Sequence, residues 1–244
     1  MIHRLVAAAL FGAGAVFAGA AAQGAGPKAV AVAVYVGGEV KVKRAGAAEP
    51  ADLKAGDNLC LGDFLKTGPG GKASLVLVYG AELRVNENTV LDFVPGPKGG
   101  GYIRIAAGQV WTRLLHKKVS IEIRTATAVC AIRGTQADIE QREVLTVKVY
   151  EGHVDVKNPA GQVSLKAGEI SRVSGPAAVP LKPAKMRGSE AGKWQEGVTA
   201  PDLGSILEKL EAAAGNGKEL EFRVGAGKAD KEIKIKLKKD GGKP

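Results

Sequence analysis

The sequence predicts an all-β protein, and three observations support that class. Apolar and polar residues alternate at 119–123 and 144–149, which is typical of strands with one face in a core and the other in water. Between these segments lies an apolar run at 128–132, which indicates a strand buried on both sides. Glycine is abundant, at 34 residues, while aromatic residues make up only 5%. This composition favours short strands joined by tight turns over long helices.

The body of the chain is built from short units that begin at a turn. An apolar segment at 30–36 is followed by a half-exposed one at 38–44. The unit Leu-Lys-Ala-Gly plus an acidic residue occurs at 53–57 and again at 165–169. Another unit, Gly-x-Val-x followed by an apolar residue or Thr, recurs at 108–112, 152–156 and 161–165. Such units cannot bury a face alone and must stack on neighbours, so we expect a solenoid-like fold or a two-sheet sandwich over residues 30–175.

Beyond residue 175 the character of the chain changes. Residues 176–200 include three prolines and are expected to form a linker. Apolar residues then recur at helical spacing, and two alternating segments follow at 220–224 and 233–237. The sequence therefore predicts a helix-plus-hairpin extension over residues 201–244. It is too small to fold well alone, and we expect it to dock on the β domain.

The N-terminus has the pattern of an export signal. A short basic start at residues 1–4 precedes an uncharged apolar stretch, and Ala20-Ala21-Ala22 supplies small residues ahead of Gln23. This pattern predicts a cleaved signal peptide over residues 1–22, and hence a periplasmic or secreted protein of a bacterium. The alternative is an uncleaved membrane anchor, because the apolar stretch is just long enough to span a bilayer.

The chain is basic, with a formal net charge of +10. Such a charge suits an anionic partner, but neither aromatic stacking platforms nor a recognition helix is visible, so nucleic acid is not expected. Three lysines near the C-terminus, Lys234, Lys236 and Lys238, alternate with apolar residues. They form either a basic ribbon that contacts lipid headgroups or a wall polymer, or a set of charges that protects an edge strand from pairing.

The chain contains two cysteines, Cys60 and Cys130. In an exported chain this number predicts one disulfide, and two buried thiols are the alternative. A sortase-like cysteine transferase based on Cys130, with His116 and Arg133 nearby, is a weaker reading because that family's Thr-Cys ending is absent. Closely spaced ligand pairs for zinc are missing. We therefore expect no catalytic residue, no metal and no cofactor.

Ile132-Arg133-Gly134-Thr135 resembles the most recognisable motif of the FecR domain family. Glycine and apolar spacings before and after it are similar to that family over residues 35–173. Its opening pattern is matched at 53–68 and 71–85, and its closing strands at 146–156 and 163–168. Three positions depart from the usual pattern: Tyr79, Ala126 and Cys130.

The resemblance implies a twisted, solenoid-like β domain that acts outside the cytoplasm in protein interaction or signal sensing. Because the residues before the first expected strand are read as signal and leader, we do not expect the cytoplasmic anti-sigma segment of the family's regulators. The expected function is a non-enzymatic binding, signalling or scaffold module for an envelope protein or surface polymer. The main alternative is an envelope-structural protein that binds anionic polymer or lipid through its basic tail.

Two readings of Arg133, Gly134 and Thr135 stay open. In the first, the motif is structural: Arg133 is part-buried and satisfies carbonyls or pairs with an acid such as Asp63, while Gly134 permits a tight turn. In the second, Arg133 binds a partner's carboxylate. Outside the motif, we expect Trp194 to pack against the β domain.

Overall fold

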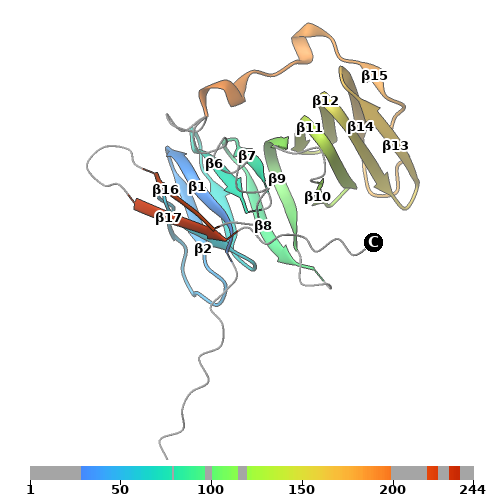
Figure 1. The fold of residues 1–244 in the computed structure, drawn as a ribbon. Helices are drawn as coiled ribbons and strands as arrows, with labels where there is room; N and C mark the ends of the chain where they lie inside the picture. Colours follow the sequence, from blue (N-terminus) through green and yellow to red (C-terminus); the bar gives the residue numbers. More distant parts are fainter. Residues whose placement is uncertain are drawn as a thin grey trace, which may run out of the picture.

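The computed structural model describes residues 29–78, 80–96, 101–114, 120–198, 219–224 and 231–236. Within these ranges the regular structure is β-strand apart from two short 3-10 turns, so the predicted all-β class is confirmed (Figure 1). The strands are β1 Ala29–Gly37, β2 Val40–Lys43, β3 Ala51–Asp52, β4 Asn58–Cys60, β5 Phe64–Thr67, β6 Lys72–Leu77, β7 Ala81–Val85, β8 Val90–Pro95, β9 Gly101–Leu114, β10 Ser120–Thr125, β11 Val129–Gln141, β12 Leu145–Asn158, β13 Gly161–Lys166, β14 Glu169–Val173, β15 Ala184–Lys185, β16 Glu219–Val224 and β17 Lys231–Lys236.

Three long strands, β9, β11 and β12, give the fold two layers because each takes part in two sheets. Sheet A contains, in order, β4, β1, β6, β7, the second half of β9, the second half of β11, the first half of β12, β14 and β15. Sheet B contains β3, β2, β5, β8, the first half of β9, β10, the first half of β11, the second half of β12 and β13. Of the two arrangements predicted, the described residues form the two-layered one.

Each long strand changes sheets at a glycine with positive φ. These glycines are Gly108 (φ 101°) in β9, Gly134 (φ 65°) in β11 and Gly152 (φ 70°) in β12. Residues with a Cβ rarely adopt this backbone conformation, and an extra residue in one strand bends it more sharply. Between Arg133 and Gln136 the register with β12 shifts, which marks such a bulge. Gly134 was predicted to permit a tight turn; in the structure it lies at a bulge within the continuous strand β11, where its positive φ bends the strand.

The inner faces of both sheets meet in a single hydrophobic core. Alternate residues of sheet A, such as Leu75, Leu83 and Ile139, pack into the same cluster as Leu65 and Ile105 of sheet B. All five are fully buried. The outer faces of the two sheets differ: that of sheet B carries exposed charges, while that of sheet A carries buried polar groups.

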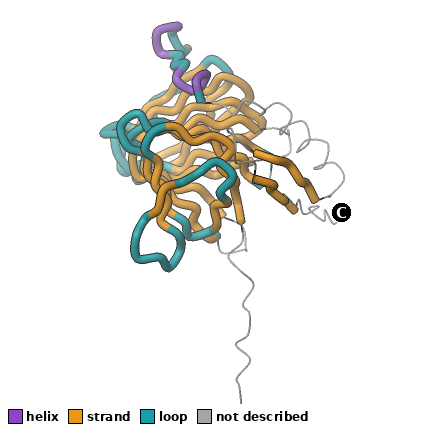
Figure 2. The backbone as a smooth tube through the Cα atoms, turned by 90° about the vertical axis from the view of Figure 1, so that its left-hand side faces the viewer, coloured by secondary structure: helices purple, strands orange, loops and turns teal. Residues whose placement is uncertain are grey.

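The segment predicted as a linker follows sheet A closely as far as residue 198. The backbone N–H of Leu181 donates to the carbonyl of Arg172 (2.9 Å), and that of Met186 donates to Gly168 (2.7 Å). Two 3-10 turns follow, η1 Gly188–Glu190 and η2 Trp194–Gly197. We call residues 186–198 the strap; it crosses the top of sheet A from β15 towards β7 (Figures 1 and 2).

The C-terminal hairpin is present as an antiparallel pair in which Leu220 faces Ile235 and Phe222 faces Ile233. Lys234 and Lys236 belong to β17, but their side chains, and the whole of Lys238, lie outside the described residues. The predicted signal peptide and the predicted helix after residue 201 lie outside them too. Across the described ranges, we find no helix with the length and apolar character needed to cross a membrane.

Candidate binding surfaces

A shallow groove lies on the outer face of sheet B, around the arginine of the Ile-Arg-Gly-Thr motif. Its floor is β11, which places the small side chains of Val129 and Ala131 on this face, followed by Arg133. Longer charged side chains rise on either side from β10 and β12, because these strands pair with β11 in register. The hollow has a volume of about 600 Å³ and is lined by Glu122, Arg124, Val129, Ala131, Arg133, Asp155, Lys157, Asn158, Pro159 and Gln162. We call it the Arg133 groove.

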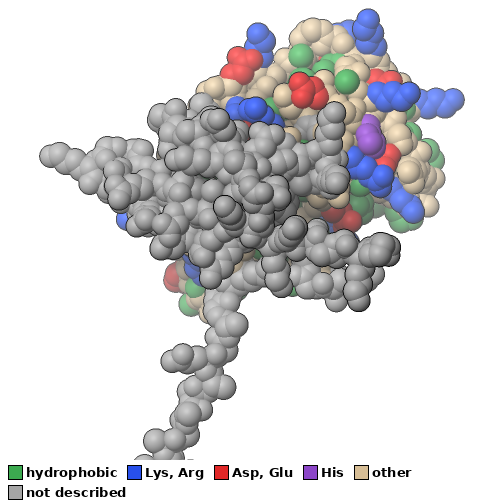
Figure 3. Space-filling model, in the orientation of Figure 1, with side chains coloured by type: hydrophobic (Ala, Val, Ile, Leu, Met, Phe, Trp, Pro, Cys, Tyr) green, Lys and Arg blue, Asp and Glu red, His purple; other side chains and the backbone are tan. Residues whose placement is uncertain are grey.

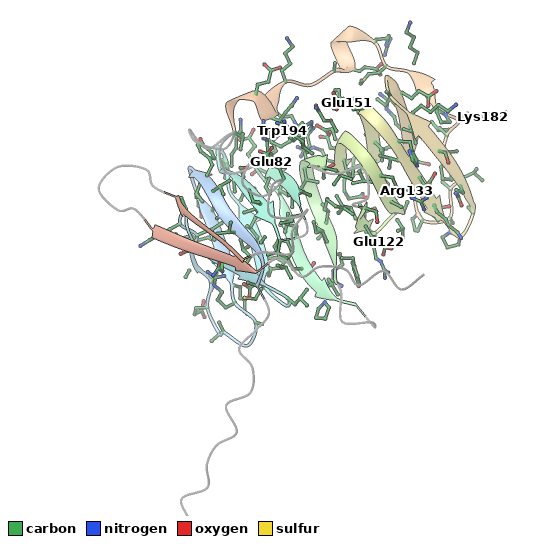
Figure 4. All side chains as sticks on the ribbon, in the orientation of Figure 1. Glu82, Glu122, Arg133, Glu151, Lys182 and Trp194 are labelled. Carbon is green, nitrogen blue, oxygen red and sulfur yellow. The ribbon has the colours of Figure 1, made fainter. Side chains whose placement is uncertain are left out.

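Charges of both signs line the Arg133 groove in rows across the strands. Arg124 pairs with Glu122 and stacks over the ring of Tyr102, with 3.8 Å from guanidinium carbon to ring centroid. Arg133 reaches Asp155 only at 3.9 Å, and 59% of its side chain is exposed. Figure 3 shows Lys and Arg side chains on the surface of the molecule, and Figure 4 shows Glu122 and Arg133 near one another on the neighbouring strands β10 and β11.

The prediction that Arg133 is part-buried is wrong, and the acid with which it pairs is Asp155, not the suggested Asp63. Asp63 is buried and bonds Arg44 (2.9 Å) and the backbone N–H groups of Ala45 (3.0 Å) and Cys60 (2.9 Å). Arg133 instead points outward, because strand alternation puts its buried neighbour Ile132 on the inner face. The side chain of Thr135 lies outside the description. An exposed arginine contributes little to stability, so its placement favours the contact reading of the motif.

The structure does not join the two cysteines. Cys130 is a free thiol, fully buried in the core, and burial raises its pKa to about 12. Across the sheet, Cys130 of β11 pairs with Ile123 of β10, which pairs with Ile103 of β9, which pairs with Phe93 of β8. Only beyond β8 does this row of paired residues reach the turn next to Cys60. Adjacent strands are about 4.8 Å apart, whereas a disulfide needs Cα atoms within about 7 Å. The predicted disulfide is therefore wrong, and the alternative of two buried thiols holds for Cys130, whereas Cys60 is partly exposed.

A buried, protonated thiol is also a poor nucleophile, which argues against the cysteine-transferase reading. His116, its suggested partner, lies outside the described residues. His153 is exposed on β12. The described part of the chain contains no cluster of histidine, cysteine and acidic side chains that could hold a metal ion.

A second, smaller hollow of about 310 Å³ lies at the other end of the sheet B face. Lys41 faces Lys66 across β2 and β5, and Lys43 faces Phe64, which is 38% exposed. Asp52 neutralises Lys41 at 2.6 Å and raises the pKa of that lysine, chiefly through the hydrogen bond. Like charges on facing strands repel, so this lysine cluster suits an anionic contact.

The outer face of sheet A carries buried charged groups, which alternation alone would place in water. Glu82 is fully buried and accepts two hydrogen bonds from the guanidinium of Arg84, at 2.5 and 3.2 Å. Ser74 donates a third to the same carboxylate (3.0 Å). Arg84 also stacks over the ring of Trp111, 4.6 Å from its centroid. Buried charges are stable only with such partners, so each charged side chain of this layer depends on the neighbours that bond it.

The strap covers this polar layer and contributes to it. The indole Nε1 of Trp194 donates to Asp138 Oδ2 (2.9 Å), and Arg84 donates to the carbonyl of Gln195 (2.6 Å). At the other end of the strap, Arg172 of β14 pairs with Glu190 at 2.8 Å. Figure 4 shows Trp194 close to Glu82 at the top of the sheet. The expected packing of Trp194 on the β domain is confirmed.

Asp138 is a fully buried carboxylate in this layer. It accepts hydrogen bonds from the amide of Gln109 (2.9 and 3.0 Å) and from Trp194. Burial raises its pKa, and the bonds from Gln109 and Trp194 and the charge of Lys148 only partly oppose that rise. The pKa of nearby Tyr150 is raised to about 12 by burial first and then by the charge of Asp138.

We expect Asp138→Asn to change the pH dependence of stability. A folded-state pKa above the unfolded value of about 3.9 means that Asp138 favours folding most below that value and progressively less as the pH rises through the folded pKa. The variant lacks this pH-dependent contribution of Asp138. The free energy of unfolding of the variant minus that of the wild type should therefore increase from pH 4 to pH 7. Urea unfolding of both proteins at the two pH values measures this difference. A difference that is constant or decreases would contradict the raised pKa.

Comparison with known proteins agrees with the motif. The model of the family described as FecR protein matches residues 63–155. Residues 63–155 therefore form a FecR domain. The match includes most of the Arg133 groove, Glu82, Arg84 and Asp138, whereas the strap and the β16–β17 hairpin lie beyond it.

Two solved structures of a candidate anti-sigma factor from Parabacteroides distasonis ATCC 8503, at 1.65 and 2.50 Å resolution, are also similar to the FecR-domain chain. Each is 16% identical, with TM-scores of 0.44 and 0.45, and each comparison covers 65% of this chain and 66% of the other. This chain thus spans slightly less than two thirds of the length of those chains. No curated protein is similar enough in sequence to match.

Proposed function

We propose that this chain is an extracytoplasmic, non-enzymatic FecR-type module that binds another envelope protein through the Arg133 groove. The observation that carries the proposal is the placement of the motif arginine: Arg133 is 59% exposed at a groove, where it adds little to the fold. The FecR domain itself supports a signalling or regulatory role. The buried state of Cys130 supports binding without bond chemistry.

The groove favours a protein segment as its partner. Its floor of Val129 and Ala131 is apolar and shallow, and Arg124 and Lys157 stand on one row while Glu122 and Asp155 stand on the next. A partner must therefore present charges of both signs in matching positions, which gives specificity more than affinity. Arg133, whose nearest acid is 3.9 Å away, has donors left for a partner's carboxylate.

A photo-crosslinking residue placed at Ala131 tests the proposal in living cells. We expect one dominant crosslinked protein band, found only in the periplasmic or secreted fraction and lost when Arg133→Glu is added. The control is the same residue at Lys182, an exposed position that does not line the groove (Figure 4). Identical bands from both positions, or a band that survives Arg133→Glu, would refute the groove as the contact. A band in the cytoplasmic fraction would refute the location.

A second candidate function is favoured by the lysine cluster around Phe64. Lys43 and Lys66 make no ion pair with another described residue, and an aromatic side chain lies between basic groups at the hollow. An anionic wall polymer fits this chemistry, and Lys234, Lys236 and Lys238 would extend it. Salt-sensitive sedimentation with isolated cell-wall polymer that Lys66→Glu abolishes, and Lys182→Glu does not, would support this candidate. Sedimentation unaffected by either change would remove it.

A further inference from the structure

The strap binds the outer face of sheet A through side-chain and backbone hydrogen bonds, as a bound peptide would. The residues that receive it form what we call the Trp194 seat: Asp138, Gln109, Arg84 and Trp111. These residues come from β7, β9 and β11, which are far from the strap in sequence. The seat contacts the strap at two adjacent points, the indole of Trp194 and the carbonyl of Gln195.

We propose that the Trp194 seat is a recognition site for a tryptophan-bearing segment of a partner protein, and that the strap is its resident, exchangeable occupant. This inference does not depend on the Arg133 groove, which lies on the other sheet. It adds a second contact surface to the module.

The seat requires an occupant with particular chemistry. Asp138 is a buried carboxylate whose described hydrogen bonds come from an amide and an indole, and no arginine or lysine bonds it. An indole N–H at 2.9 Å donates to Oδ2, whereas a phenylalanine ring would leave the buried carboxylate with the amide of Gln109 as its one side-chain donor among the described residues. The guanidinium of Arg84 then needs an acceptor, which the carbonyl one residue after the tryptophan provides. A segment with tryptophan at this spacing from a free carbonyl fits both requirements.

The strap itself is held loosely enough to be exchanged. Of residues 186–198, only Val198 is fully buried, and the two 3-10 turns bury none of their residues. Two buried polar atoms of the layer, Trp111 Nε1 and Gln195 Oε1, find no hydrogen-bond partner. Native proteins keep few such atoms, so these two are free to accept a partner's donor or donate to its acceptor.

Exchange would change how the sheets are tethered to the C-terminal hairpin. The strap is the first part of the chain between β15 and β16, so its release adds residues 186–198 to the segment that links the β domain to the β16–β17 hairpin. When a partner's tryptophan takes the place of Trp194, the connection between the sheets and the β16–β17 hairpin would therefore become longer. This is a two-state arrangement of the kind that a signalling module needs.

Trp194→Ala in the full chain, titrated with a synthetic peptide of residues 186–198, tests the proposal by calorimetry. We expect saturable binding to this variant and binding to the wild-type chain at least about tenfold weaker, because the attached strap competes at an effective concentration in the millimolar range. The same peptide carrying W194F should lose most of its affinity for the variant, because it has no N–H for Asp138.

Circular dichroism and a cooperative thermal transition must first show that the variant is folded. If Trp194→Ala does not fold, Trp194→Phe keeps the ring, lacks only the N–H, and takes its place. The absence of saturable binding to the folded variant would overturn the proposal. So would equal affinity of the native and W194F peptides, or equal affinity of the native peptide for the variant and for the wild type.

Discussion

Glu82→Ala is expected to lower the free energy of unfolding by about 3–5 kcal/mol, because it leaves the guanidinium of Arg84 buried without its carboxylate. Glu82 is fully buried and Arg84 only 8% exposed, so water cannot replace the lost partner. Ser74 loses its acceptor as well. For a domain of this size, 1 kcal/mol corresponds to about 2–4 °C in Tm, so a decrease on the order of 10 °C should be seen by calorimetry.

The matched control removes both charges. In Glu82→Leu combined with Arg84→Met, no unpaired charge remains, and replacement of a buried pair by apolar residues of similar size is often neutral or stabilising. The double variant should therefore be more stable than Glu82→Ala alone. A double variant at least as unstable as the single one would show that shape and packing in this layer, and not the unpaired charge, dominate.

Much of the fold could be predicted from the sequence because strand alternation and glycine spacing are local signals. Segments 30–36 and 161–165 lie within β1 and β13, whereas the motif glycine, Gly134, lies at a bend within a strand and not at the tight turn that was expected. The sharing of β9, β11 and β12 between two sheets was not predictable, because a bent strand and two separate strands show the same alternation.

The candidate sites were harder to predict because they depend on what covers each sheet. Alternation correctly puts Glu82 and Asp138 opposite the core, and without the strap both would be expected in water. The one available signal was Trp194 in a proline- and glycine-rich segment, which indicated a docking point but not its acceptor. Arg133 shows the converse error, since its place at the end of an apolar run suggested burial, whereas the bend at Gly134 leaves it at an open groove.

Gly108→Ala is expected to be strongly destabilising, by roughly 3 kcal/mol or more. The glycine has a φ of 101°, and a Cβ there would lie 2.4 Å from both Cα and Oγ1 of Thr89. The collision is with backbone, so no side-chain rotation relieves it. The close approach of Gly108 to Thr89 also allows a hydrogen bond, because Thr89 Oγ1 accepts from the backbone N–H of Gln109 (3.0 Å). This bond connects the start of β8 to the bend in β9. Shifting either strand would break that bond as well.

Gly134→Ala is the matched control, because it changes the equivalent glycine at the bend of β11. Its φ is 65°, but a Cβ there meets nothing within 4 Å, so only the left-handed backbone penalty of about 1–2 kcal/mol applies. Urea unfolding of the two variants should therefore differ by at least about 1 kcal/mol, with Gly108→Ala the less stable. Equal losses would mean that backbone conformation alone sets the requirement for glycine at the bends. The contact between β8 and β9 would then have no part in holding the two sheets at their angle.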